Sequence, residues 1–322
     1  MKPKIVVVGS FVQDLTWKCS SFPGAGETVI GKFISGPGGK GSNQAVAAGR
    51  AGIATMFIGA VGRDIFAEGA RKFYEEEGIG ARWAVKPAHS TGTAAILVNA
   101  AAENEIVVAL GASEQLRARD VDPALLRGAK VVVCQHEANL QINAHVFRVA
   151  RKAGVATILN PAPMRPDFDA GILRLTDIFI PNESELVALV NQLPGCAHLR
   201  GRRGLDSREL EKMDPGQLNR LCRTLGVPTV IITLGRRGCL VSMADGSHEF
   251  IAAHAGIKVM DTTGAGDAFV GGFAAGFVRH RGDIISAARY GNAVAALSVT
   301  KFGTAPSMPR QEQIRRFIAG KR

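Results

Sequence analysis

Short apolar runs alternate with longer amphipathic stretches along most of the chain. The runs predict buried strands at residues 4–9, 54–61, 131–134, 156–160, 177–180 and 229–234. The stretches between them predict helices at residues 42–52, 64–77, 139–153, 182–192 and 215–225. Ser42 and Asp64 stand where a helix N-cap is expected. This alternation predicts an α/β fold, a doubly wound and mainly parallel sheet flanked by helices.

Two stretches break this alternation. Residues 28–35 and 92–110 have the pattern of strands and a hairpin, with no helix between them. We expect a small β-sheet lid formed by segments of about 15–36 and 90–112, within a single domain spanning residues 1–322. The alternative is that these strands extend the main sheet.

Composition and charge narrow the class of protein. Hydrophobic residues make up 46% of the 322 residues and charged residues 21%, which is ordinary for a soluble globular protein. The net charge of +11 attracts anions and by itself motivates an RNA-binding hypothesis. The densest basic run, residues 198–212, has no aromatic residue on which a base could stack. We therefore interpret residues 194–214 as a solvated surface excursion and expect no nucleic-acid partner.

The cysteines and the chain ends bear on the compartment. Five cysteines, widely spaced and without a Cys-x-x-Cys pair, argue against a zinc site or a disulfide framework and favour a reducing compartment. The first residues lead into a buried strand pattern instead of a signal peptide, and no apolar run reaches membrane-spanning length. The last residues carry no peroxisomal signal. We expect a cytoplasmic protein with no membrane partner.

A glycine-rich stretch at residues 36–41, GPGGKG, contains G-x-G-x-x-G. It does not follow the first predicted strand, as a dinucleotide-binding fingerprint would, and Lys40 is followed by Gly41 instead of the Ser or Thr of a P-loop. The remaining interpretation is a glycine turn where the backbone approaches a small ligand. Lys40 and Asn43 would then stand at the start of a helix.

The stretch DTTGAGDAF at residues 261–269 combines small residues with two carboxylates. Gly264, Ala265 and Gly266 can direct successive backbone N–H groups at an anion, and a helix beginning near Asp267 adds its positive end. A carboxylate there repels a bound phosphate, but it can serve as a base for a hydroxyl that attacks a phosphoryl group. The alternative is that Asp267 only caps the helix.

These two stretches, continued as 38–52 and 261–272, resemble the two signatures of the ribokinase or PfkB family of sugar kinases. PNESE at 181–185 and ITLGRRG at 232–238 match two further family motifs, and the resemblance runs in register from about residue 4 to 310. It implies a ribokinase-like fold with a β lid and ATP-dependent phosphorylation of the primary hydroxyl of a small sugar, D-ribose first. Alternatives are a kinase for deoxyribose, another furanose or a nucleoside, and a non-catalytic sugar or nucleotide sensor.

The resemblance also implies residue roles in catalysis and sugar binding. Asp267 would be the catalytic base, and Gly264, Ala265 and Gly266 would stabilise charge on the phosphoryl oxygens. The sugar-contact positions, which Asp267 shares, are Asp14, Gly39, Lys40, Asn43 and Glu137. Val12 departs from the pattern, because bacterial members place a polar Asn two residues before the first Asp.

Nucleotide and cation positions follow from the same resemblance. Those for the nucleotide are Asn182, Thr233, Leu234, Gly235, Arg236, Arg237, Gly238, Gly266 and Asn292. Asn182 and Glu185 would hold Mg²⁺ through water. A monovalent K⁺ activator would be held by Asp261, Thr263, Ser298, Lys301, Gly303 and Ser307. A homodimer through the lid is the expected assembly.

Overall fold

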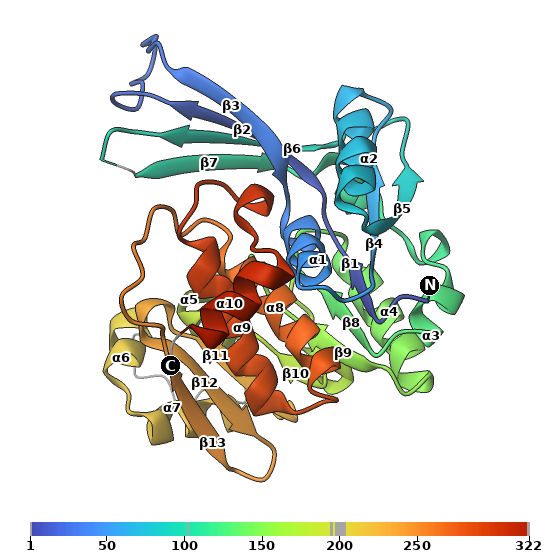
Figure 1. The fold of residues 1–322 in the computed structure, drawn as a ribbon, viewed down its shortest axis with the longest axis vertical. Coiled ribbons are helices and arrows are strands. Elements are labelled where there is room, and N and C mark those ends of the chain that lie inside the picture. The colour runs from blue at the N-terminus through green and yellow to red at the C-terminus, as the bar shows by residue number, and fades with distance from the viewer. Residues whose placement is uncertain (1, 102, 194–195, 197–203, 321–322) are drawn as a thin grey trace.

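The computed structural model describes residues 2–320 except 102, 194–195 and 197–203. Within these ranges a nine-stranded sheet runs in the order β13-β12-β11-β10-β9-β8-β1-β4-β5 (Figure 1). Its strands are β1 (Ile5–Val8), β4 (Thr55–Val61), β5 (Gly80–Val85), β8 (Val131–Cys134), β9 (Ala156–Leu159), β10 (Ile178–Phe179), β11 (Thr229–Thr233), β12 (Gly238–Met243) and β13 (His248–Ala252). The strands from β11 to β5 are parallel, whereas β12 and β13 are antiparallel.

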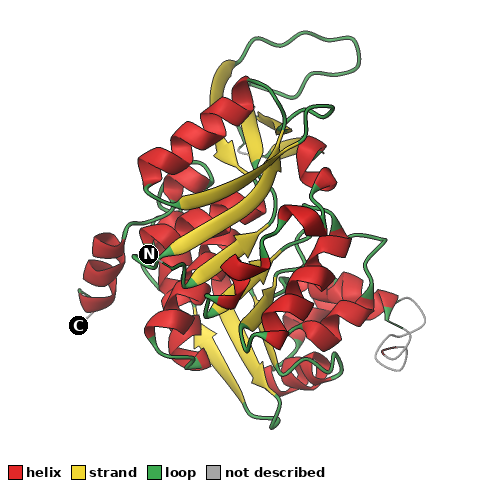
Figure 2. Ribbon diagram, turned by 90° about the vertical axis from the view of Figure 1, so that its right-hand side faces the viewer, coloured by secondary structure: helices red, strands yellow, loops and turns green. Residues whose placement is uncertain are grey.

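Helices cover both faces of this sheet, which confirms the doubly wound prediction (Figures 1 and 2). Alternate side chains of β1 divide between two cores, Ile5 and Val7 in one, Val6 and Val8 in the other. The first core includes residues of α1 (Lys40–Arg50), α2 (Ile65–Glu77), α8 (Ala265–Arg279), α9 (Ile284–Ser298) and α10 (Gln311–Ala319). The second includes residues of α3 (Pro123–Arg127), α4 (Leu140–Lys152), α5 (Glu183–Gln192), α6 (Ser207–Lys212) and α7 (Pro215–Arg223).

A second, four-stranded sheet projects beyond the main one (Figure 1). Its strands are β2 (Val12–Lys18), β3 (Lys32–Gly38), β6 (Gly92–Val98) and β7 (Asn104–Ala109), in the order β3-β2-β6-β7. It shares no strand with the nine-stranded sheet, so the alternative in which these strands extend the main sheet is wrong. Asp64 ties it to the main body, because its carboxylate accepts from the Thr91 backbone N–H and hydroxyl, both at 2.7 Å.

The capping predictions had mixed outcomes. Asp64 caps α2 by accepting from the Ala67 N–H at 2.9 Å, as expected. Ser42 was wrongly predicted as a cap, because α1 begins two residues earlier, at Lys40. Ser42 is instead buried in the first turn, where its hydroxyl oxygen accepts from the Tyr74 hydroxyl at 3.1 Å.

Three other expectations concern surface and compartment. The stretch 194–214 lies partly outside the described residues, and its described part includes α6, so it is not all loop. All five cysteines are free thiols. Within the described ranges, no helix has both the length and the apolarity needed to cross a bilayer.

Helices α1 and α8 pack closely enough to require glycine at their crossing. A Cβ added at Gly271 would lie 2.4 Å from the Gln44 carbonyl oxygen and 2.6 Å from the Ala47 Cβ. Both neighbours belong to α1, whose backbone cannot move without shifting the side chains at its N-terminal end. The crossing therefore fixes the relative position of two helix N-termini.

We expect Gly271→Ala to lower the free energy of unfolding by about 1–3 kcal/mol, because overpacking outweighs the gain in helix propensity. Gly69→Ala is the matched control, since a Cβ at that helical glycine meets nothing within 4 Å. The control should raise the free energy of unfolding by about 0.5–1 kcal/mol. Urea unfolding of both variants checks this, and equal effects would contradict the crossing argument.

Candidate active site

Polar side chains gather where the parallel strands end. The strand order reverses between β1 and β8, and ligands in such sheets bind beyond the carboxyl ends of strands at this switch point. The residues that follow or end β1, β8, β9, β10 and β11 here are Ser10, Glu137, Asn160, Asn182 and Thr233. The N-termini of α1 and α8 carry further residues of the site, which the chain assembles from distant segments.

Asp267 lies in the first turn of α8 and is 6% exposed. Its Oδ2 accepts from Asn43 Nδ2 and its Oδ1 from Gln44 Nε2, both at 2.9 Å. Gly264, at φ 77°, is the N-cap residue, with no side-chain capping bond. The capping alternative for Asp267 is therefore wrong. Burial raises the pKa of Asp267, while Lys40 and the two amides act in the opposite direction.

Gln44 was missed by the sequence reasoning, although it follows the predicted Asn43. Its Nε2 also donates to Asn160 Oδ1 at 3.0 Å, and its Oε1 accepts from Gln135 Nε2 at 2.6 Å. Gln44, Gln135 and Asn160 are all buried. Buried side-chain amides seldom remain without hydrogen-bond partners. The only sequence signal for these three residues was their position near the ends of predicted strands and helices. They hold Asp267 in one orientation.

Lys40 is the positive charge of this site. Burial lowers the pKa of its ammonium, but Asp267, Glu137, Glu185 and Asp14 raise it more, so the net shift is upward. A buried ammonium among four carboxylates is held in its charged form. The preceding Gly39 has φ 86°, and a Cβ there would lie 2.7 Å from the Val12 N atom, so only glycine fits this turn.

Two further carboxylates reach the site from other elements. Glu137 Oε2 accepts from the Ser10 hydroxyl and the Lys40 backbone N–H, both at 2.8 Å. Asp14 Oδ2 accepts from the Thr304 hydroxyl at 3.0 Å. Burial raises the pKa of Asp14 to about 6, although the Thr304 bond acts against this shift. Thr304 was also missed, because a lone threonine in a loop carries no sequence signal.

A cavity of about 180 Å³ opens beside Asp267. Its lining includes eight of the predicted residues, namely Lys40, Asn182, Glu185, Thr233, Gly264, Ala265, Gly266 and Asp267. Asn182 and Glu185 form a reciprocal capping box on α5, with N–H to oxygen distances of 2.8 and 2.9 Å. Burial raises the pKa of Glu185, against the Asn182 N–H and the Lys40 charge.

Six of the nine predicted nucleotide residues do not line this cavity. Asn292 Nδ2 donates to the Ala252 carbonyl at 2.8 Å, and Arg237 donates to the Glu211 carbonyl. Arg236 is exposed. Leu234, Gly235 and Gly238 form the turn between β11 and β12. These positions border the end of β11, outside the cavity.

Three of the predicted cation residues are joined by hydrogen bonds at one turn. Asp261 Oδ1 accepts from the Thr263 N–H and Oδ2 from the Gly303 N–H, both at 2.9 Å. Asp261 thus braces the turn before α8. Ser298 and Ser307 direct their hydroxyls at backbone carbonyls, and Lys301 is exposed.

Comparison with known proteins gives one consistent result. The profile of the pfkB family carbohydrate kinases matches residues 2–311. The chain is 34% identical to a deoxyribokinase of Salmonella typhi over 320 residues, covering 98% of each chain. It is 34% identical to a ribokinase of Mus musculus over 316 residues, covering 96% of this chain and 93% of the relative. The structure of Arabidopsis thaliana ribokinase complexed with ribose and ATP matches with a TM-score of 0.81, 27% identity and 99% coverage of both chains.

We expect Gln44→Met to raise the pKa of Asp267 further, because it removes a hydrogen bond that favours the ionised carboxylate. Activity that needs the ionised form should then fall off at a higher pH. Carboxyl ¹³C NMR of Asp267 and the pH profile of kcat check this. Tyr74→Phe, which also loses a buried bond to α1, is the control. Equal shifts in both variants would show that the effect is not specific to the Gln44 amide.

Proposed function

The chain belongs to the pfkB family of carbohydrate kinases, and from this premise we propose that it converts D-ribose and ATP to D-ribose 5-phosphate and ADP. One observation carries the proposal. A buried carboxylate, Asp267, is oriented by two amides at a helix N-terminus, beside a lysine and three further carboxylates. This arrangement suits a base next to an anion hole. A sensor would need no such base.

The proposed reaction is an in-line transfer. Asp267 takes the proton from the primary hydroxyl of the sugar, and that oxygen forms a bond to the γ-phosphorus of ATP. The bond from the γ-phosphorus to the bridging oxygen breaks, and ADP leaves with that oxygen. Backbone N–H groups of Gly264, Ala265 and Gly266 would donate to the phosphoryl oxygens as negative charge redistributes, with the Ala265 N–H exchanging its 3.1 Å bond to the Thr262 carbonyl.

We assign sugar recognition to Asp14, Gly39, Lys40, Asn43 and Glu137. Carboxylates at Asp14 and Glu137 can accept from hydroxyls, and Lys40 can donate to them. Asn43 already donates to Asp267, so its role is shared between the base and the sugar.

A second candidate substrate is 2-deoxy-D-ribose. Val12 is 2% exposed and stands at the start of β2, two residues before Asp14. An apolar side chain there provides no hydrogen bond to a hydroxyl. The similarity to the Salmonella typhi deoxyribokinase is as high as that to the mouse ribokinase, so both sugars belong in the first assay.

The residues present fit a hydrated Mg²⁺ bound with the nucleotide. Glu185 is 8% exposed yet lines the cavity with Asp267, and its carboxylate keeps lone pairs beyond the Asn182 bond. Among the described residues, no group of three or more His, Cys, Asp or Glu is arranged so that it could hold a metal ion by itself. Mg²⁺ commonly needs only one or two carboxylates plus phosphates and water. When bound, it would neutralise phosphate charge.

We place K⁺ activation at the turn braced by Asp261, with Thr263, Ser298, Lys301, Gly303 and Ser307 around it. Asp261 supplies a negative charge beside the anion hole, and backbone carbonyls of this loop can supply further oxygen ligands. An ion there would set the geometry of residues 261–264 without touching the substrate.

For the nucleotide, we assign Asn182, Thr233, Leu234, Gly235, Gly238 and Gly266, with Arg236, Arg237 and Asn292 at the outer edge. Thr233 pairs with Asn182 in a parallel bridge and lines the cavity. The turn from β11 to β12 therefore leads from the part of the cavity lined by Thr233, where we expect the phosphates of the nucleotide, toward solvent.

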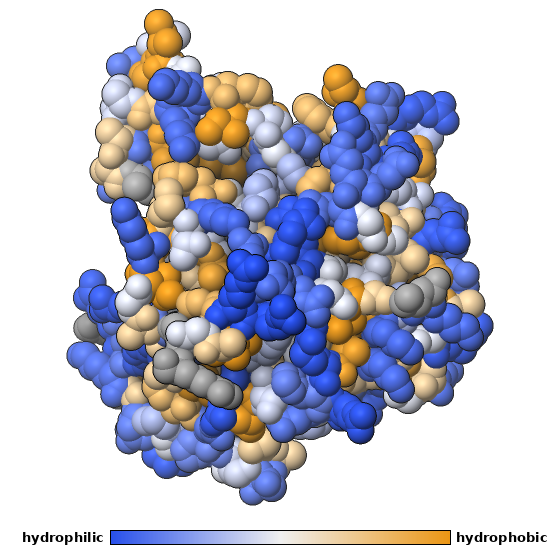
Figure 3. Space-filling model, viewed as in Figure 1, coloured by the Kyte–Doolittle hydropathy of each residue, from blue (hydrophilic) through white to orange (hydrophobic). Residues whose placement is uncertain are grey.

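We propose that the second sheet is the lid and that it pairs two copies of the chain. Several large apolar side chains of β3 and β7 are exposed, among them Phe33 at 55%, Ile34 at 52% and Val107 at 74%. Figure 3 shows hydrophobic residues gathered on this projecting part of the molecule. Exposed apolar strands commonly pair with another chain. Analytical sedimentation at micromolar protein concentration measures the oligomeric state. Detection of monomers alone would contradict the proposal.

We expect fast ADP release with ATP, Mg²⁺ and K⁺ when D-ribose is supplied, and slower release with 2-deoxy-D-ribose, other pentoses and nucleosides. Asp267→Asn should lower kcat by about 10²–10⁴-fold, because it removes the base while keeping the side-chain size. Coupled assay of the panel with both proteins checks this. Turnover on deoxyribose alone would replace the substrate but keep the mechanism, whereas full activity of the variant would refute the role of Asp267.

We expect several-fold higher kcat in K⁺ than in tetramethylammonium at equal ionic strength, because only the smaller ion fits the turn. Asp261→Asn should reduce this ratio, since it weakens the negative charge that attracts the ion. Steady-state rates in the two salts check this. Equal rates in both would rule out monovalent activation.

A further inference from the structure

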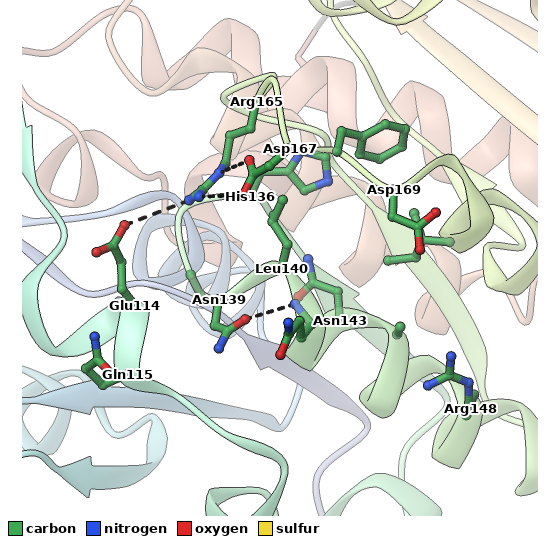
Figure 4. A pocket seen from close by; sticks show the side chains of 15 residues that line it. Glu114, Gln115, His136, Asn139, Leu140, Asn143, Arg148, Arg165, Asp167 and Asp169 are labelled. Carbon is green, nitrogen blue, oxygen red and sulfur yellow. Dashed lines mark hydrogen bonds and ion pairs between the residues drawn. The ribbon is translucent and has the colours of Figure 1, made fainter. Parts of the chain in front are cut away.

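A larger cavity, of about 750 Å³, lies between α4 and the segment that follows β9 (Figure 4). Its mouth includes Glu114 and Gln115 of the 3₁₀ helix η1 (Gly111–Gln115), and Ile172 of η3 (Ala170–Leu175) is also part of the wall. None of its lining residues lines the 180 Å³ cavity beside Asp267. It is therefore a separate space, which the kinase mechanism does not use.

The segment that continues β8 through residues 135–139 lies between the larger cavity and the hydrogen-bonded side chains of the active site. Gln135 and Glu137 belong to the active-site side, where Gln135 donates to Gln44 and Glu137 accepts from Ser10 and Lys40. His136 and Ala138, between and after them, line the larger cavity. Neighbouring side chains of this segment, which bends at residues 136–138, therefore belong to different sites.

Two buried side chains of the larger cavity have polar atoms without hydrogen bonds. Asn143 is 1% exposed, and its Nδ2 donates to the Gln135 carbonyl at 2.7 Å, which leaves Oδ1 without a donor. His136 is also 1% exposed, and its Nδ1 has no partner. Burial, with the nearby Arg165 charge, lowers the pKa of His136 to about 4, so the ring is neutral. A buried polar atom without a partner is unfavourable, and a ligand that pairs with it removes that cost.

The lining suits a neutral ligand better than an anion. Three carboxylates (Glu114, Asp167 and Asp169) oppose two guanidinium groups (Arg148 and Arg165), which gives a formal charge of −1. Arg165 is already held by Asp167 through bonds of 2.9 and 3.0 Å.

Side chains on the wall also offer hydrogen-bonding groups and an apolar face. Amides of Asn139, Asn143, Gln115 and Gln141 can bond hydroxyls, and the Phe168 ring, 5.2 Å from His136, offers a face for C–H groups. In Figure 4, Asn143 lies at the centre of the lining, with Arg165 and Glu114 to one side and Arg148 and Asp169 to the other.

We propose that this cavity binds a neutral, hydroxyl-rich small molecule of monosaccharide or nucleoside size, as an effector separate from the phosphorylated sugar. A ligand hydroxyl donating to Asn143 Oδ1 would fix Asn143, which holds the Gln135 backbone. Gln135 in turn bonds Gln44, whose amide orients Asp267. Occupancy therefore changes the kinetics through a continuous chain of buried amides. The inference does not depend on which sugar is the substrate.

The test compares cavity-filling variants with a surface control on the same helix. Ala144→Phe places a ring in the cavity, and Gln141→Trp blocks it from an exposed position if the first variant does not fold. Lys152→Phe adds the same ring at an exposed position of α4 outside the lining. Calorimetric titrations with ADP present would use D-ribose, 2-deoxy-D-ribose, D-xylose, D-glucose, adenosine, uridine and ribose 5-phosphate.

We expect at least one neutral compound to bind both the wild type and the Lys152→Phe control. Its affinity for the cavity-filling variant should be tenfold or more lower. The same compound should change kcat/KM for the substrate twofold or more, in the wild type and the control only. The proposal is overturned if no neutral compound shows this event, if the cavity-filling variants bind equally well, or if ribose 5-phosphate binds there in preference.

Discussion

Two hydrogen bonds from α1 to Asp267 decide how the site of this protein is built. Asn43 and Gln44 precede Asp267 by more than two hundred residues, yet each amide reaches one carboxylate oxygen at 2.9 Å. Those distances require the close crossing of α1 and α8 at Gly271. Because α1 begins at the end of β3, the same crossing sets where the second sheet joins the main body. A shift of one helix would displace the base, Lys40 and the sheet together.

The electrostatic balance of the site explains why this precision matters. Four carboxylates surround one lysine, and burial raises the pKa of Asp14, Glu185 and Asp267. Removing so many charges from water is unfavourable unless each has partners. Asp14 and Glu137 have few hydrogen-bond donors around them, so both carboxylates keep lone pairs that can accept further bonds. Under the proposed function, sugar hydroxyls would supply further hydrogen-bond partners for these carboxylates.

The sequence was sufficient for the parallel strands other than β5 and for the glycine turns, since buried strands and glycine-rich turns have strong local patterns. It was insufficient where partners lie far apart along the chain. Ser42 has the composition of a cap, but Gly39 supplies the turn and Tyr74 uses the hydroxyl. Gln44 and Thr304 become informative only when the fold brings Asp267 and Asp14 to them. The hairpin of β12 and β13 was missed because it interrupts the strand–helix alternation.

The loop that contains Thr304 connects parts of the site that otherwise belong to separate elements. Its Gly303 N–H donates to Asp261, which braces the turn that becomes the anion hole, and the next residue, Thr304, donates to Asp14 on β2. The Thr304 hydroxyl also lies 3.3 Å from the Pro37 carbonyl on β3. Gly303 and Thr304 therefore join the second sheet to the turn before α8. Under the proposed function, a movement of the second sheet toward bound sugar would reach that turn through these two adjacent residues before any chemistry occurs.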